Sequence, residues 1–282
     1  MADNLFQFEE AFADLEIGAT SSFLKTGALR STIIAISEEG VYQPILLDFG
    51  ATSNPDEVFE EARRYLIRSH HPTAYGFISQ AWSYGMDQPT ISFVYDDRQK
   101  LQNEIIILVL WAQSGESRGM AFPVRRKGET ISFDRPWKPD HGPVILCPIG
   151  DIWRNPLCVG DLVRTRPGMR RLVEPGTELW ETLIALIRLR IHGDQAHASE
   201  YQQCLDDIRN SIYIVHGRDR FHSGRLILRP RTLFNPLGFL VGEADSLILL
   251  QEGEGTPGAI RHGVLADELH HPNLPAGAAS SR

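Results

Sequence analysis

The sequence is poor in cysteine and has no long uncharged apolar run. Three cysteines at wide intervals, Cys147, Cys158 and Cys204, fit neither a disulfide framework nor a zinc motif. The longest apolar runs, 104–112 and 179–191, are too short or too charged to cross a hydrocarbon layer of roughly 30 Å. Residues 1–20 contain no Lys or Arg, the reverse of a secretory leader. These absences predict a soluble protein of a reducing compartment, which we expect to be the cytoplasm.

Lysine is also scarce, because Lys25, Lys100, Lys127 and Lys138 are the only four among the 28 basic residues. The formal net charge is −8 over 282 residues, and the amino end is the most acidic part. A chain this acidic does not indicate a general nucleic-acid binder, although the stretch 164–231 is richer in arginine. A hydrophobic content of 42% is enough for a core of normal size.

Hydrophobic periodicity predicts an α+β fold: a mostly antiparallel sheet with one principal helix in the N-terminal half, then a helix pair with short strands. The helix runs from Pro55 to about Ser69, with Asn54 as its N-cap. A hairpin of residues 31–37 and 41–49 precedes it, and strands at 74–84, 91–95 and 105–110 follow, with two further strands beyond. The unbroken apolar run 105–110 predicts a strand that is covered on both faces.

Composition divides the chain into four predicted parts. Residues 1–134 form the sheet module, ordered from about residue 20, and the Pro/Gly-rich stretch 135–176 is a connector. Residues 177–252 form a helix pair with short strands; Thr177 caps the first helix, and Ser199 with Gln202 makes a capping box for the second. Residues 253–282 have too little apolar surface for a core, which predicts a disordered tail.

No segment carries a known catalytic or cofactor motif, so any cofactor stays open and we assign no metal ligands. The densest polar cluster is a loop in which His216, Asp219 and His222 are candidate catalytic residues and Arg218 and Arg220 candidate anion ligands. The competing interpretation is a solvated turn with local Asp–Arg pairing. His192, Asp194 and His197 suggest either one metal or the end of a helix, and the helix end is the better-supported interpretation.

The main functional hypothesis comes from the predicted strand 74–84, whose successive side chains point to opposite faces of the sheet. If Tyr75 and Phe77 face the helix, Trp82 and Tyr84 lie on the opposite, apolar face, which needs a cover. We therefore expect a non-catalytic binding or interaction protein that uses this face, with Trp82 and Tyr84 as binding residues. A protein partner or self-association is the expected interaction, and a small-molecule ligand is possible. The alternative is a metal-assisted hydrolase or phosphodiesterase that uses the His216–His222 loop, so enzyme activity stays open.

Overall fold

The fold is given by a computed structural model that describes residues 6–50, 52, 54–84, 90–93, 103–139, 146–219, 224–230, 240–254 and 260–262. It divides into two compact units. The first contains the described residues of Met1–Asp151 and Thr256–Arg282, and the second those of Ile152–Gly255. The predicted α+β class is confirmed. No helix within the described ranges is long and apolar enough to cross a membrane.

The first unit is built on one antiparallel sheet with the strand order β13-β2-β1-β3-β5-β6-β7, and β4 pairs with the end of β3. The predicted hairpin, the strand at 74–84 and the strands that follow it are all present. The strands are β1 (Thr32–Ile36), β2 (Tyr42–Leu47), β3 (Ala74–Tyr84), β4 (Thr90–Ser92), β5 (Asn103–Ala112), β6 (Ser117–Lys127), β7 (Thr130–Phe133) and β13 (Ile260–His262).

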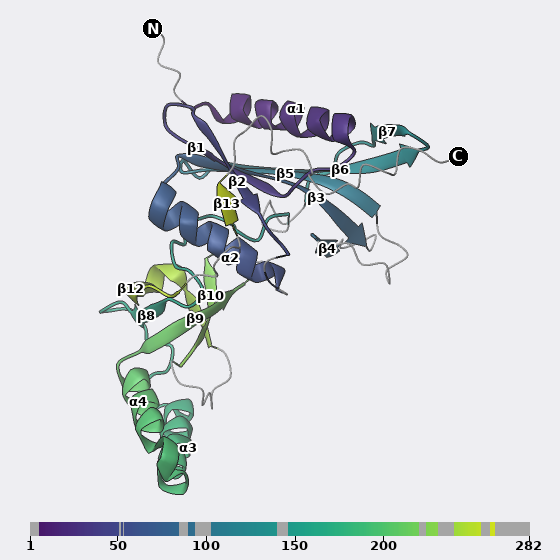
Figure 1. The fold of residues 1–282 in the computed structure, drawn as a ribbon. Helices are drawn as coiled ribbons and strands as arrows, with labels where there is room; N and C mark the ends of the chain where they lie inside the picture. Colours follow the sequence, from purple (N-terminus) through teal and green to yellow (C-terminus); the bar gives the residue numbers. More distant parts are fainter. Residues whose placement is uncertain are drawn as a thin grey trace. The chain divides into compact units, whose positions relative to one another are not determined.

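A helix that the sequence analysis did not predict, α1 (Phe8–Thr26), covers one face of this sheet (Figure 1). Glu9 and Glu10 lie in its first turn, where the helix dipole favours negative charge, and Gly27 ends it with a left-handed φ of 72°. The inward stripe of α1 consists of Ala11, Phe12, Leu15, Ala19 and Phe23.

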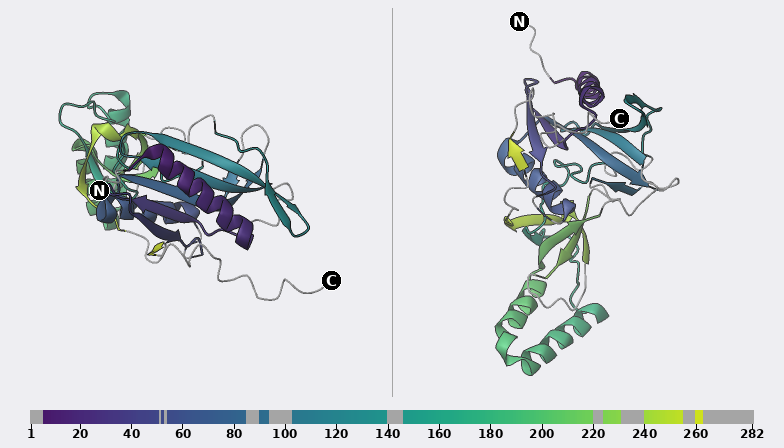
Figure 2. Two further views of the ribbon diagram at one scale, coloured as in Figure 1. Left: turned by 90° about the horizontal axis from the view of Figure 1, so that it is seen from above. Right: turned by 45° about the vertical axis from the view of Figure 1, so that its right-hand side comes forward.

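The position of α1 corrects two expectations. The module is ordered from its first helix and not from about residue 20, and the apolar face opposite Tyr75 and Phe77 is largely covered by the chain itself. Ile34, Ile78, Ile106 and Leu108 form one core with α1. Gly76 also belongs to this face, and a Cβ there would collide with Leu15 of α1. The view from above in Figure 2 shows α1 lying across the strands.

The predicted helix from Pro55 is confirmed and covers the other face. It consists of α2 (Pro55–Tyr65) and a π-helical turn, η1 (Leu66–His70). Asn54 accepts a hydrogen bond from the Asp56 N–H at 3.1 Å, as its N-cap position predicts. Phe59 of α2 contacts Phe77 of β3 with 5.8 Å between ring centroids. Figure 1 shows α1 and α2 on opposite sides of the sheet.

Part of the predicted connector belongs to the core of the first unit. Leu146, Cys147 and Ile149 are buried. The Tyr75 hydroxyl donates to the Gly150 carbonyl at 2.6 Å, and the buried Arg63 guanidinium donates to the Ile149 carbonyl. The segment 146–151 is therefore packed structure, held by backbone carbonyls that accept from buried side chains.

The predicted disordered tail also needs a partial correction. Residues 260–262 form β13, which pairs antiparallel with Ile45–Leu47 of β2. A short strand can satisfy the otherwise unpaired edge of β2 without a large apolar content, so composition gave no sign of it. The remainder of the predicted tail, 263–282, lies outside the described residues.

The second unit combines an antiparallel sheet of order β11-β10-β9-β8-β12 with a helical hairpin. Its sheet core includes Val163, Tyr213, Val215 and Leu226. Two strands, β8 and β9, were not predicted; β8 lies inside the predicted connector. The strands are β8 (Leu162–Thr165), β9 (Ile212–Arg218), β10 (Arg225–Arg229), β11 (Leu240–Glu243) and β12 (Leu247–Gln251).

The hairpin consists of α3 (Glu178–Gly193) and α4 (Ala198–Arg209), which pack on each other as predicted (Figure 2). The Thr177 hydroxyl caps α3 by accepting from the Trp180 N–H at 3.2 Å. The predicted capping box at Ser199 is wrong. A 3₁₀ turn, Gln195–His197, runs directly into α4, so Ser199 already lies inside the helix.

The contribution of α1 can be tested with two substitutions in that helix. Phe12→Ala removes a side chain that is 1% exposed, whereas Ile17→Ala changes one that is 64% exposed. We expect Phe12→Ala to lower the free energy of unfolding by about 3–5 kcal/mol because it leaves a cavity between helix and sheet. Ile17→Ala is expected to change it by less than about 0.5 kcal/mol. Urea denaturation measures both, and equal midpoints for the two variants would contradict this role of α1.

Candidate functional site

The candidate site is a pocket of about 430 Å³ at one end of the first unit's sheet. It is formed where β1 begins and where β2 and β3 end. This volume lies within the range of ligand pockets, roughly 300–1,000 Å³. We call it the sheet-end pocket; its lining is Leu29, Arg30, Ser31, Leu46, Leu47, Asp48, Phe49, Gly50, Gln80, Trp82 and Phe93.

One side of the pocket is aromatic. Phe49 and Phe93 are stacked, with 5.7 Å between ring centroids and an interplanar angle of 11°. Both also contact Phe59 of α2, at 5.3 and 5.0 Å. Trp82 extends from the end of β3, where its backbone pairs with Glu104 of β5 and Ser92 of β4. These rings offer flat apolar surface to a ligand.

Four polar side chains complete the lining, and the first three, Arg30, Ser31 and Asp48, differ in what they can offer. Within the described part of the chain, the Arg30 guanidinium makes no hydrogen bond or ion pair. The Asp48 carboxylate accepts from the Gly50 N–H at 3.0 Å, which closes the turn after β2. Ser31 shares a 2.5 Å hydrogen bond with the buried Ser79. Arg30 is therefore the group best placed to receive an anion.

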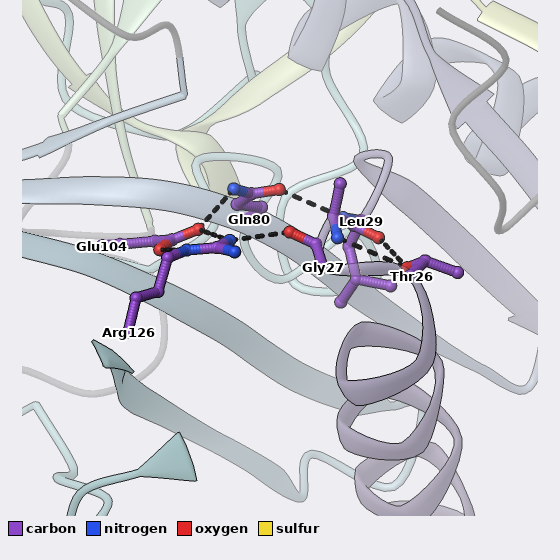
Figure 3. A network of polar contacts seen from close by, with 7 residues as sticks. Thr26, Gly27, Leu29, Gln80, Glu104 and Arg126 are labelled. Carbon is purple, nitrogen blue, oxygen red and sulfur yellow. Dashed lines mark hydrogen bonds and ion pairs between the residues drawn. The ribbon is translucent and has the colours of Figure 1, made fainter. Parts of the chain in front are cut away.

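Gln80 joins the pocket to a polar network at the end of α1 (Figure 3). Its side-chain oxygen accepts from the Leu29 N–H at 3.1 Å, and its nitrogen donates to Glu104 at 2.6 Å. Arg126 of β6 holds both oxygens of Glu104, each at 2.7 Å, and donates to the Gly27 carbonyl at 2.7 Å. Both ends of the amide are thus held by hydrogen bonds, which restrain this part of the pocket wall.

Electrostatics explain why this network tolerates partial burial. Glu104 has 17% of its side chain exposed and is paired with a bidentate guanidinium. The hydrogen bonds that Arg126 donates to Glu104 raise the pKa of Arg126 above its ordinary value. The guanidinium also lies 5.4 Å from the ring centre of Phe23 in α1. The network therefore connects the C-terminus of α1, β3, β5 and β6 at the side of the pocket.

The predicted binding residues have different outcomes. Trp82 lines the sheet-end pocket, which places it among the candidate ligand contacts. The backbone of Tyr84 pairs with Thr90, but its side chain lies outside the described part of the chain. Arg30, Gln80 and Phe93 were not predicted. Their positions in the sequence carry no shared motif, because the pocket joins four separate segments.

Of the predicted His216–His222 loop, only part can be placed. His216 is solvent-exposed in β9 and is the extra residue of a β-bulge opposite β10. Arg218 donates to the Leu157 carbonyl, and the Asp219 N–H donates to the Arg225 carbonyl at 3.2 Å. Arg220 and His222 lie outside the described residues. The hydrolase alternative therefore stays a prediction.

The other histidine cluster, His192, Asp194 and His197, lies at the turn between α3 and α4. His197 Nδ1 lies 3.0 Å from Asp194 Oδ2, and the Tyr201 hydroxyl donates to the same oxygen at 3.1 Å. The hydrogen bond with His197 is the main cause that lowers the pKa of Asp194. His192 is exposed on α3. Among the described residues, no group of three His, Cys, Asp or Glu side chains is arranged to hold a metal ion.

No protein-family model, curated protein or solved structure matches this chain.

The cysteines provide a test of the packing of segment 146–151. All three are buried, and burial raises the pKa of the Cys147 thiol to about 12. At about pH 8 only ~10⁻⁴ of such a thiol is ionised, and the thiolate is the reactive form. We expect Ellman's reagent to modify no cysteine of the folded protein on the minute timescale, and all three in denaturant. Rapid modification of the native protein would contradict the packing of segment 146–151 if Cys147 is the residue that reacts.

Proposed function

We propose that this chain is a non-catalytic binding protein whose first unit takes a small organic anion into the sheet-end pocket. The ligand has a flat apolar body, which lies against Trp82, Phe49 and Phe93, and an anionic group, which pairs with Arg30. The observation that carries the proposal is the juxtaposition of the Arg30 guanidinium, which has no hydrogen-bond or ion-pair partner among the described residues, with aromatic walls in one pocket of about 430 Å³.

Physical chemistry favours this ligand over a purely apolar or a purely ionic one. A guanidinium in a partly apolar site forms stronger charge-assisted hydrogen bonds than one in bulk water. The aromatic side chains supply area with little conformational entropy to lose, since Phe and Trp have only two side-chain torsions. The fixed amide of Gln80 adds a preorganised wall, which lowers the entropic cost of binding.

The probe for this pocket is 8-anilino-1-naphthalenesulfonate, which combines flat aromatic rings with a sulfonate. We expect Arg30→Gln to weaken its affinity about tenfold or more, the equivalent of one charge-assisted hydrogen bond of roughly 1.5–3 kcal/mol. Arg125→Gln is the matched control, because the Arg125 side chain is 73% exposed and pairs with Asp134 away from the pocket lining. Fluorescence titration of the full chain measures all three affinities.

An uncharged analogue separates the two parts of the site. N-phenyl-1-naphthylamine has the same rings without the sulfonate, so Arg30→Gln is expected to leave its binding unchanged. Trp82→Ala is expected to weaken both probes, and Trp82→Phe to restore most of the loss because it retains a flat ring. Unaltered sulfonate binding by Arg30→Gln and Trp82→Ala would exclude the pocket as the site.

A further inference from the structure

The helix α3 of the second unit carries apolar residues on two sides. The first stripe, Leu183, Ile184 and Ile187, is buried against Tyr201, Cys204, Leu205 and Ile208 and forms the core of the helical hairpin. The second stripe consists of Leu179, Leu186 and Leu189, whose exposed fractions are 49%, 43% and 68%. We call this second set the α3 stripe. The hairpin itself does not require it, since the first stripe already covers α4.

The spacing of the α3 stripe is that of an interface between helices. Leu179 and Leu186 are seven residues apart and Leu189 follows three residues later, which places all three on one side of the helix. Thr182, also exposed, occupies the remaining position of this side. The stripe covers ten residue steps, or about 15 Å of helix.

The charges of α3 are divided along its length. Glu178 and Glu181 lie in its first turn, and Arg190 and His192 in its last, with Arg188 just before them. Two copies of α3 in parallel would place like charges side by side. In an antiparallel pair each acidic half lies beside the basic half of the other copy, and the two helix dipoles oppose each other favourably.

We propose that the α3 stripe is a self-association surface on which the α3 of a second copy of this chain lies antiparallel. The contact is isologous: Leu179 of each copy lies at the level of Leu189 of the other, and Leu186 at the level of Thr182. The surface is one helix wide and falls below the roughly 1,600 Å² of a standard stable interface. The association is therefore concentration-dependent, with a dissociation constant on the order of 10–100 μM.

Analytical ultracentrifugation of the full chain between about 1 and 300 μM tests this association around its dissociation constant. The wild-type chain is expected to shift from monomer to dimer across this range. Leu186→Glu is expected to remain monomeric, because it places a charge at the centre of the stripe. Ile17→Glu is the matched control, because Ile17 is also an exposed apolar residue but belongs to another helix, α1, and this variant is expected to dimerise normally. Circular dichroism confirms that each variant is folded.

Charge reversal tests whether the charged ends of α3 stabilise the contact. A chain with Glu178→Arg and Glu181→Arg, and a second chain with Arg188→Glu and Arg190→Glu, should each be monomeric alone. An equimolar mixture of the two is expected to form heterodimers, because one α3 is then basic and the other acidic along its whole length. A wild-type chain that stays monomeric at the highest concentration overturns the proposal. Dimerisation that survives Leu186→Glu, or that Ile17→Glu weakens equally, overturns the assignment to α3.

Discussion

The structure of the first unit depends on burying both faces of β5. Residues 105–110 are all apolar and no more than 1% exposed, so the strand is stable only between two layers. Burial of each such side chain contributes about 1.5–3 kcal/mol. The sequence supplies the two layers from either side of the β1–β2 hairpin, with α1 before it and α2 after it. The sheet-end pocket lies where the two helices no longer cover the sheet. Its first lining residue, Leu29, follows the end of α1, and the lining residues 46–50 come just before the start of α2.

The same constraint explains the polar network beside the pocket. Gln80 and Glu104 lie on the face that α1 covers, but beyond the residues of the apolar core. Polar side chains there must find partners as water is removed, and Arg126 with the backbone of Gly27 and Leu29 supplies them. The network thus marks the boundary between the dry helix–sheet core and the pocket. A pocket wall fixed in this way can select a ligand by shape as well as by charge.

Local sequence signals made α2 and the β1–β2 hairpin predictable. The helix α1, the strand β13 and the pocket could not be predicted, because they depend on contacts with residues distant in the sequence. Asn54 and Pro55 indicate the start of a helix, and runs of β-branched residues indicate strands. In α1 the inward residues include small ones, Ala11 and Ala19, and Gly18 and four acidic residues lie between or beside them, so its amphipathic pattern is weak. The strand β13 is three residues long and is recognisable only by its pairing with β2. The pocket joins residues from 29 to 93, and only Trp82 stood out from the sequence, as an aromatic residue on an unassigned face.

The two units differ in how much of their apolar surface they bury, and their architecture explains the difference. A sheet has two faces, and the first unit carries a helix for each. A helical hairpin has a single interface, so α3 can bury only one of its two apolar stripes against α4. The leucines of the other stripe recur at helical spacing. The charges that flank them change sign along the helix axis, from acidic at the N-terminal end to basic at the C-terminal end. A surface with that charge gradient complements itself only when it is turned end to end, which is the symmetry of a two-fold dimer.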